Sequence, residues 1–593
     1  MIIGSAAIIN QFLEFELVFP NEIRQEPAYY LKGGNKEVIL RAASHFLGFK
    51  PKNSIYHNHI ELLNKFFHAQ NRKFGDNLSI IIQKIESQQK INNNFNHKVL
   101  IINNWSSLTL FETFFQLDIG EITQTPIEFE INLMKAYLSI NSIFTKNQSL
   151  AEESTEELDK EIRYPIYNFC SQYPIYDKVD YDLKLLFFTQ LIKAYYFFQY
   201  FENEINFKYL YDSFLANFKC ENPKSYLNKI VLLILTLLKA DKEAHCDINI
   251  PRDEHFEINC SFLKKLCLSE DNRMNDEDFI ALRSNPMYEL SNGIYRVIFN
   301  LFLVEKIFKG LYFQLRDINR KMLDSIKISD NKLKGIYCNE FSEKYLLYKI
   351  LDIIYASENR IIKFSGKYFS DNRIDGGPDY YIRIGNNLLL FESKDFLIKA
   401  SIKQSFDYDK YYYEFERTLI KEEIKPGKVK RGAVMQLSYF IRKVLKREFI
   451  DDTNYQYKKL NIYPILITHD SQYDTPGFNF MVNDWFTDEK ITLNDEGYYI
   501  NKIKPLVVIN IDTLIHHQEI LSHEYPLHII LDKYNSEVLL KKANLKYNKH
   551  YEYIMDSCQS FSMFIDNFLG NLNLRRPPKI LYEISPAIFE NSN

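Results

Sequence analysis

The spacing of apolar residues changes once along the 593-residue chain, near residue 328. Before that point apolar residues recur every three or four positions, as in Leu183–Phe201 and Tyr226–Lys239, which is the spacing of amphipathic helices. After it, short apolar runs alternate with Gly, Asn and Asp, as strands and turns do. We therefore predict a large, mostly helical region over residues 1–327, followed by a mixed-sheet α/β domain with a C-terminal extension over residues 328–593.

Within the first region the pattern predicts long elements. Glycine and proline number 18 each, together about 6% of the chain and roughly half of the usual 12%, so turns are few. Helices are predicted at Ile60–Phe67 and Ile131–Phe144. A long helical stretch is predicted over Asn285–Asp324, with Gly293 and Gly310 as possible breaks, because Asn285 and Pro286 have the order of an N-cap and a first helical residue. A strand pair is predicted at Ile8–Phe19.

Composition excludes several classes of protein. Apolar residues make up 46% and charged residues 25% of the chain, which is typical of a globular protein and not of a disordered one. Lys and Arg total 73 against 77 Asp and Glu, giving a formal charge of −4. Any surface that binds nucleic acid must therefore be a local basic patch.

The sequence also predicts a cytoplasmic protein without a membrane partner. Its seven cysteines are scattered and include no C-x-x-C pair, which indicates reduced thiols. The longest apolar run, Ile230–Leu238, has nine residues, whereas a membrane-spanning helix needs about 20. Residues Met1–Ala7 lack the basic flank and the apolar stretch of a signal peptide.

The second region is predicted to follow the order α-β-β-β-α-β-β. Its second and third strands form a hairpin over Gly385-Asn386-Asn387. The predicted elements are a helix at Glu340–Ser357, strands at Ile361–Tyr368, Tyr380–Ile384 and Leu388–Glu392, a helix at Val429–Phe449, and strands at Ile462–Thr468 and Pro505–Ile511, with a turn at Asp371–Gly377 before the hairpin.

Two short motifs in this region carry chemistry. Two motifs, Gly376-Gly377-Pro378-Asp379 and Glu392-Ser393-Lys394, are separated by twelve intervening residues. The two-residue period of a strand places Glu392 and Lys394 on one face, and hairpin pairing brings Asp379 close to them. Two clustered carboxylates repel each other unless a divalent cation lies between them, and oxygen ligands suit Mg²⁺ or Mn²⁺. The lysine can orient or deprotonate a water for attack on a phosphodiester, so this is a candidate hydrolytic nuclease centre.

On these motifs, residues from about Glu340 to Thr468 resemble the PD-(D/E)xK nuclease superfamily, which has the restriction-endonuclease-like αβββαβ fold. The resemblance implies that Asp379 and Glu392 are metal ligands and that Lys394 is the catalytic lysine. It also implies that the main-chain carbonyl of Ser393 is a ligand of the Mg²⁺ or Mn²⁺ ion.

Many members of the superfamily add a glutamate from the helix before the sheet. Here Glu343 is the first candidate for this further metal ligand, and Glu340 is the second.

The motif pair is more specific than either half alone. Of the 18 prolines only Pro378 is followed by Asp. The alternative is a surface hairpin with an exposed Glu–Lys pair. Leu388–Phe391 is apolar on both faces, however, which indicates a buried strand ahead of Glu392.

The stretch after Lys394 offers candidate contacts to nucleic acid. Residues 394–448 contain 14 Lys or Arg against 8 Asp or Glu, a local excess of six positive charges. A solvated helix face is the alternative interpretation. Some relatives in the RecB branch carry Gln-x-x-x-Tyr on the helix after the lysine. Gln404–Tyr408 has this spacing, and Gln436–Tyr439 is one residue short but lies on the expected helix. The predicted contacts to phosphate are Gln436, Lys428, Lys430, Arg431, Arg442 and Lys443.

The resulting expectation is a Mg²⁺-dependent endonuclease, acting on DNA more readily than on RNA. The helical region would regulate, sense or recruit. Such combinations are typical of prokaryotic antiviral defence and mobile elements, and the lack of a P-loop suggests a partner ATPase or another defence protein. One alternative is a catalytically inactive nucleic-acid-binding or scaffold protein that keeps the nuclease fold. Another is a small-molecule hydrolase that uses His469, which follows a predicted strand near the candidate centre.

Overall fold

The computed structural model describes residues 8–47, 59–93, 96–118, 120–179, 181–204, 207–239, 245–269, 277–358, 360–425, 428–540 and 558–589. The chain forms two compact units. Unit 1 comprises Met1–Leu150, Ile175–Gln190 and Asp212–Leu315. Unit 2 comprises Ala151–Pro174, Leu191–Tyr211 and Arg316–Asn593. Unit 2 therefore includes two segments from the first 327 residues as well as the C-terminal part.

Unit 1 is mostly helical. The helices predicted at Ile60–Phe67 and Ile131–Phe144 lie within or overlap helices α4 and α7. The helices that form or begin in unit 1 are α1 (Phe15–Val18), α2 (Pro27–Leu31), α3 (Lys36–Phe46), α4 (His59–Phe66), α5 (Arg72–Asn93), α6 (Asn104–Gln116), α7 (Pro126–Glu153), α9 (Tyr176–Val179), α10 (Leu183–Glu202), α12 (Pro223–Lys239), α13 (Phe256–Lys264), α14 (Ile280–Ser284), α15 (Asn300–Glu305) and α16 (Leu311–Arg320), and α11 (Lys208–Asn217) enters it from unit 2.

Unit 1 also contains two small sheets. Strand β1 (Ile8–Phe12) pairs in parallel with β2 (Asn96–Leu100). The strand pair predicted at Ile8–Phe19 is therefore wrong in part: its second half forms α1, and the partner of β1 lies almost 90 residues further along the chain. The second sheet is antiparallel, with the order β3 (Asp247–Asn249), β5 (Ile294–Val297), β4 (Met287–Ser291).

The long helix predicted over Asn285–Asp324 is also wrong. Its first part is the β4–β5 hairpin, and helix returns only at α15 and α16. Asn292-Gly293 joins the two strands, and Gly293 has a φ of +87°. An Asn-Gly pair between strand-like runs is a strong hairpin signal, and here it overrides the helical spacing of the apolar residues.

Unit 2 is built on a five-stranded mixed sheet with the order β12-β11-β8-β7-β6. The pairs β6–β7 and β7–β8 are antiparallel. The pairs β8–β11 and β11–β12 are parallel. The strands are β6 (Ile361–Ser365), β7 (Tyr380–Ile384), β8 (Asn387–Lys394), β11 (Asn461–Thr468) and β12 (Val507–Asn510). They occur in the predicted order, so the predicted mixed sheet in an α+β layout is confirmed.

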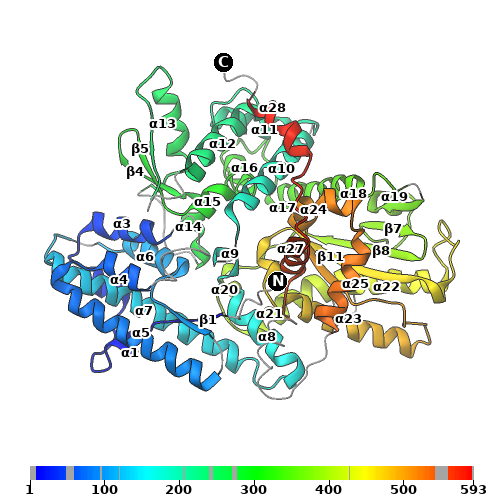
Figure 1. Ribbon diagram of the computed structural model, residues 1–593. Helices are drawn as coiled ribbons and strands as arrows, with labels where there is room; N and C mark the ends of the chain where they lie inside the picture. Colours follow the sequence, from blue (N-terminus) through cyan, green and yellow to red (C-terminus); the bar gives the residue numbers. More distant parts are fainter. Residues whose placement is uncertain are drawn as a thin grey trace. The chain divides into compact units, whose positions relative to one another are not determined.

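Helices cover both faces of this sheet (Figure 1). On one face Tyr380 of β7 packs against Tyr348 of α18 (Leu347–Ile354), with ring centroids 5.3 Å apart. On the opposite face Tyr381 packs against Phe440 of α22 (Ala433–Lys446), with centroids 6.2 Å apart. The core strand residues between these layers are fully buried, including all of Leu388–Phe391.

Two boundaries differ from the predicted ones. Helix α22 begins four residues after the predicted start at Val429, because β10 (Lys428–Arg431) pairs with β9 (Lys421–Lys425). The predicted strand Ile361–Tyr368 ends early, because the Ser365 side chain accepts a hydrogen bond from the Tyr368 amide and caps α19 (Gly366–Asp371).

The other elements of unit 2 surround this core. They are α8 (Lys160–Gln172), α17 (Asp330–Lys334), the π-helical segment η6 (Gly335–Leu346), α20 (Ala400–Lys403), α21 (Tyr408–Phe415), η7 (Glu416–Ile420), η8 (Tyr457–Lys459), η9 (Ser471–Asp474), α23 (Phe478–Asp495), α24 (Ile511–His523), α25 (Leu527–Tyr534), η10 (Asn535–Leu539), α27 (Phe561–Asn571) and α28 (Ile580–Phe589). None of the helices in the described residues combines the length and apolar character needed to cross a membrane. All seven cysteines lie among the described residues, where they are buried and form no disulfide.

Candidate active site

The β7–β8 hairpin brings the two predicted motifs together. Its register pairs Tyr380 with Phe391, and one further step places Asp379 opposite Glu392. The backbone amide of Ser393 donates a 2.7 Å hydrogen bond to Oδ2 of Asp379. Asp379 therefore lies beside the C-terminal end of the buried strand β8, at the opposite end of the hairpin from the turn at Gly385, which has a φ of +58°.

Glu392 and Lys394 form an ion pair, with 2.7 Å between Lys394 Nζ and Glu392 Oε1. The Glu392 side chain is 0% exposed, whereas the Lys394 side chain is 25% exposed. The second carboxylate oxygen of Glu392, Oε2, is buried and has no hydrogen-bond partner among the described residues. A buried acceptor that lacks a partner destabilises the folded state, and acceptors of this kind often await a ligand.

Helix η6 supplies a third carboxylate. Oε1 of Glu343 accepts a 2.8 Å hydrogen bond from the backbone amide of Asp395, the residue after β8. Glu340, the other predicted candidate, instead pairs with Lys344 at the surface, where both side chains are about half exposed. The structure thus places Glu343 and not Glu340 beside the candidate centre.

The electrostatics of this group are unbalanced. Burial, and then the charge of Asp379, raises the pKa of Glu392 to about 8. Burial also raises the pKa of Glu343 to about 7 and the pKa of Asp379 above its ordinary value, although Lys394 opposes both shifts. Burial alone would lower the pKa of Lys394, but Glu392, Asp379 and Glu343 together raise it. Lys394 lies among three carboxylates, and Lys344 is a second cation that acts on one of them, Asp379, so in their ionised form the carboxylates outnumber these cations.

Helix α22 holds the loop that carries Asp379. Nε2 of Gln436 donates a 3.2 Å hydrogen bond to the Gly377 carbonyl, and the Tyr439 hydroxyl donates to Oδ2 of Asp375 at 2.9 Å. Gly376 has a φ of +67°, and a Cβ there would lie 2.5 Å from the Tyr439 ring. The contact of Gln436 in the structure is therefore with the loop backbone, which makes it a positioning residue for Asp379.

The predicted basic contacts are mostly paired with acidic or carbonyl groups. Arg431 pairs with Asp375 at 3.1 Å, and Lys443 donates to the Asp375 carbonyl at 2.5 Å. Arg442 forms a two-pronged pair with Glu496, at 2.7 and 2.8 Å.

The remaining two predicted contacts are on strand β10. Lys430 lies 3.9 Å from Glu422, while Lys428 begins the strand and its side chain lies outside the described residues. To bind phosphate, Arg431, Arg442 and Lys443 would first have to give up the contacts described above. The count of basic residues therefore overstates the positive charge available to nucleic acid.

His469 lies close to the same strand, but on the other face. Its Nε2 is 2.8 Å from Oγ of Ser393, a residue that alternates with Glu392 and Lys394 along β8. Burial, and then the charge of Lys193, lowers the pKa of His469 well below its ordinary value, so the imidazole stays neutral. Ser393 is 0% exposed and cannot reach a substrate, so this pair acts as a structural hydrogen bond.

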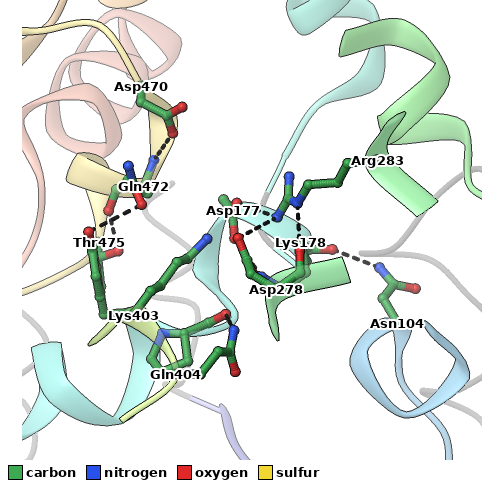
Figure 2. Close-up of polar contacts among 12 residues, drawn as sticks. Asn104, Asp177, Lys178, Asp278, Arg283, Lys403, Gln404, Asp470, Gln472 and Thr475 are labelled. Atoms are coloured by element: carbon green, nitrogen blue, oxygen red, sulfur yellow. Dashed lines mark hydrogen bonds and ion pairs between the residues drawn. The ribbon is translucent and has the colours of Figure 1, made fainter. Parts of the chain in front are cut away.

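Lys193 and Asp470 fix the position of His469. Lys193, on α10, forms an ion pair with Asp512 and lies 3.4 Å from the His469 carbonyl. Asp470 caps η9 by accepting a 3.0 Å hydrogen bond from the Gln472 amide, as Figure 2 shows. Sequence reasoning missed Lys193, because it lies almost 200 residues before β8 and belongs to no local motif.

A second buried charged cluster lies in unit 1. Lys178 Nζ is 3.0 Å from Asp177 and 2.7 Å from Asp278, and Arg283 lies 2.7 Å from Asp177 (Figure 2). Arg283 also pairs with Glu305 at 3.3 Å. Asn104 donates a 3.0 Å hydrogen bond from Nδ2 to the Lys178 carbonyl.

The charges of this second cluster balance. Lys309 completes it at 3.2 Å from Glu305, so three carboxylates face three cations. Burial alone would lower the pKa of Arg283, but Asp278, Asp177 and Glu305 raise it above its ordinary value. Asp278 and Phe279 both have positive φ, +61° and +60°, a backbone conformation that the buried ion pairs help to hold.

Comparisons with known proteins gave no relative. No family model matches the chain, and neither a curated protein nor a solved structure is significantly similar to it.

Among the described residues, no group of three or more His, Cys, Asp or Glu side chains forms a ready-made metal site. A zinc site would need such a group of protein ligands. A Mg²⁺ site does not, because Mg²⁺ is usually held by one or two carboxylates together with water and substrate phosphate.

Proposed function

We propose that unit 2 is a metal-dependent nuclease that hydrolyses phosphodiester bonds, with the restriction-endonuclease-like fold of the PD-(D/E)xK superfamily. One observation carries the proposal: three carboxylates lie around Lys394 at the end of β8, and Oε2 of Glu392 is buried without a hydrogen-bond partner among the described residues. The mixed sheet and its α-β-β-β-α-β order support the assignment of the fold.

The donor set fits a divalent cation. When ionised, these carboxylates carry more negative charge than the nearby cations neutralise, which suits a divalent cation such as Mg²⁺ or Mn²⁺, and carboxylate oxygens are the ligands that both ions prefer. Asp379 and Glu392 would hold the ion, together with the main-chain carbonyl of Ser393 and with Glu343. When bound, the ion supplies polarisation of the phosphoryl oxygen and charge neutralisation.

Between the two members of the ion pair, Glu392 and Lys394, it is Lys394 that can contact substrate. Its side chain is partly exposed, and its pKa is raised, so it is protonated at neutral pH. A protonated ammonium donates hydrogen bonds and cannot accept a proton. Lys394 therefore orients the attacking water or the scissile phosphate and stabilises the negative charge that develops there.

Glu392 holds Lys394 in place through the 2.7 Å ion pair, and the loop contacts of Gln436 and Tyr439 hold Asp379. These fixed positions lower the entropic barrier, because the reacting groups need not be gathered for each turnover. We propose DNA as the preferred substrate over RNA. We further propose a role in antiviral defence with a partner ATPase or other defence protein, which follows from the family resemblance of the two motifs.

The direct test is cleavage of supercoiled plasmid DNA and of single-stranded RNA by the full-length protein with Mg²⁺, Mn²⁺ or EDTA. We expect metal-dependent cleavage, reduced about 10³-fold or more in Asp379→Asn and in Lys394→Ala. Lys367→Ala is the matched control, because Lys367 is an exposed lysine on α19 that pairs with Asp371 at 2.9 Å, and we expect this variant to keep full activity.

Three results would contradict the proposal. Cleavage in EDTA, or equal cleavage by the wild type and both site variants, would exclude this centre. Binding of DNA without cleavage under any metal condition would favour the inactive, nucleic-acid-binding alternative.

A further inference from the structure

A cavity of about 410 Å³ opens on unit 1, far along the chain from the candidate nuclease centre. Two helices provide most of its wall. Helix α3 contributes Val38, Arg41, Ala42, His45 and Phe46, which lie on one face at the i, i+3, i+4, i+7, i+8 spacing. Helix α7 contributes a second face with the same spacing, from Pro126 to Leu133. The cavity is therefore built from regular elements, and its volume lies in the range of about 300–1,000 Å³ of small-molecule sites.

The body of the cavity is aromatic. Phe46 and Phe66 stack with centroids 6.0 Å apart and an interplanar angle of 19°, and Phe129 adds a third ring to the wall. Phe46 is itself fixed by an edge contact with Tyr137 at 6.0 Å. A flat aromatic ligand would bury its faces against these rings, since aromatic pairs gain energy beyond their buried area.

The polar rim favours an anion. Its carboxylate, Glu130, is already engaged: it pairs with Nδ1 of His68 and accepts a 2.8 Å hydrogen bond from Asn71. Arg41 also lines the cavity, and no hydrogen bond or ion pair joins its side chain to the described residues. Its guanidinium suits a carboxylate or phosphate through paired N–H donors.

A metal site is the competing interpretation, because His45, His68 and His245 all line the cavity. Among the described residues, however, no three His, Cys, Asp or Glu side chains are arranged to hold a metal ion. Apolar rings also make up much of the wall, which suits an organic ligand better than a hydrated cation.

We propose that unit 1 contains a binding site for a small aromatic anion of about mononucleotide size, with its ring against Phe46 and Phe66 and its anionic group on Arg41. Such a site gives the helical part of the chain a ligand to sense. The inference stands on the cavity alone and does not depend on nuclease activity.

The test is isothermal titration of the full-length protein with AMP, GMP, CMP and UMP, with the matching nucleosides, and with indole-3-acetate as an aromatic carboxylate. We expect at least one anion to bind with a Kd below about 1 mM and at least tenfold more tightly than its uncharged counterpart. Binding of the nucleotides alone identifies phosphate as the anionic group, and binding of indole-3-acetate alone identifies carboxylate.

Three variants locate the site. Arg41→Ala removes the anion contact, and Ala42→Phe fills the cavity from the same helix; each should weaken binding about tenfold or more. Arg72→Ala is the control, because this exposed arginine on α5 contacts Asn64 at 2.8 Å and does not line the cavity. Absence of saturable binding for every probe up to about 10 mM overturns the proposal. Equal affinity of the wild type, Arg41→Ala and Ala42→Phe also overturns it, as does equal affinity for nucleosides and nucleotides.

Discussion

The two buried charged clusters differ in how their charges balance. In unit 1, Arg283, Lys178 and Lys309 face the carboxylates of Asp177, Asp278 and Glu305, and every one of these groups has a partner of opposite charge. In unit 2, Lys394 faces the carboxylates of Glu343, Asp379 and Glu392, and Lys344 acts on Asp379 as well, so these carboxylates outnumber the two lysines.

This difference teaches how to separate a structural cluster from a candidate site. A balanced cluster needs nothing further, and its parts come from segments that the fold must bring together in any case. An unbalanced cluster destabilises the folded state until protons or a cation neutralise its charge. Such clusters therefore occur mainly at functional sites. Burial is the first cause of the raised pKa values of Glu343 and Glu392, and the neighbouring carboxylates raise both further.

The largest expected effect comes from breaking the balanced cluster. Arg283→Met removes a cation of which only 16% of the side chain is exposed, and leaves Asp177, Asp278 and Glu305 with too few partners. We expect the free energy of unfolding to fall by about 3–5 kcal/mol, because buried carboxylates would lose their counter-charge. Urea unfolding measures this change. Lys367→Met, at an exposed pair, should change it by less than about 1 kcal/mol, and an equally small effect of Arg283→Met would show that the cluster does not stabilise unit 1.

The next effect is a pH dependence that belongs to the unbalanced cluster. Burial, with Asp379 adding to it, raises the pKa of Glu392 from 4.5 to about 8, and burial raises that of Glu343 from 4.5 to about 7. Between pH 4.5 and 8 the folded state therefore holds more protons than the unfolded state, so stability decreases as the pH rises through this window. We expect a loss of roughly 2–4 kcal/mol between pH 5 and 8 without metal.

Saturating Mg²⁺ should flatten this dependence, because a bound cation stabilises the ionised carboxylates. Urea unfolding at several pH values, with Mg²⁺ or EDTA, measures both curves. Stability that is independent of pH in EDTA, or that rises between pH 5 and 8, would contradict the surplus of negative charge.

A smaller effect on the free energy of unfolding is expected for Glu392→Gln, and it is opposite in sign to the effect of Arg283→Met. Glu392→Gln keeps the shape of the side chain but removes the negative charge that this buried carboxylate carries when ionised. At pH 8 in EDTA we expect the variant to be more stable than the wild type by about 1–2 kcal/mol, since the amide no longer carries a buried charge. The matched variant in unit 1, Asp177→Asn, removes a needed charge and should be destabilising. If both variants were destabilised alike, the contrast between the clusters would fail.

The sequence predicted those features whose signals are local. The β7–β8 hairpin follows from a turn of Gly and Asn between two apolar runs, and the buried strand Leu388–Phe391 follows from its unbroken apolar character. The meeting of Asp379 with Glu392 and Lys394 then follows from strand geometry. The β4–β5 hairpin was missed although Asn292-Gly293 signals it, because the helical spacing around it was given more weight.

Other features depend on residues that only the tertiary fold brings together. The Arg283 cluster draws on segments near residues 177, 278 and 305, and Lys193 reaches the His469 carbonyl from a helix nearly 280 residues earlier. No window of sequence contains these partners. The prediction of nucleic-acid contacts over 394–448 is incomplete for a related reason: a count of charges does not show that Arg442 pairs with Glu496, or Arg431 with Asp375.

The smallest expected effect distinguishes positioning from phosphate binding at Gln436. The sequence predicts a phosphate contact, whereas in the structure the amide donates to the Gly377 carbonyl two residues before Asp379. Gln436→Ala would loosen this loop without changing the charge of the site. We expect kcat for plasmid cleavage to fall about fivefold, equivalent to about 1 kcal/mol, with KM for DNA unchanged. Tyr439→Phe, which removes the hydrogen bond to Asp375, should act in the same way and to a similar extent.

A rise in KM that grows with salt concentration, with kcat intact, would instead assign Gln436 to the nucleic acid, because contacts to phosphate weaken as salt increases. Positioning by Gln436 and Tyr439 would mean that the surplus of charge at the centre is held in place by neutral contacts around it, which is the arrangement that the balanced cluster of unit 1 does not need.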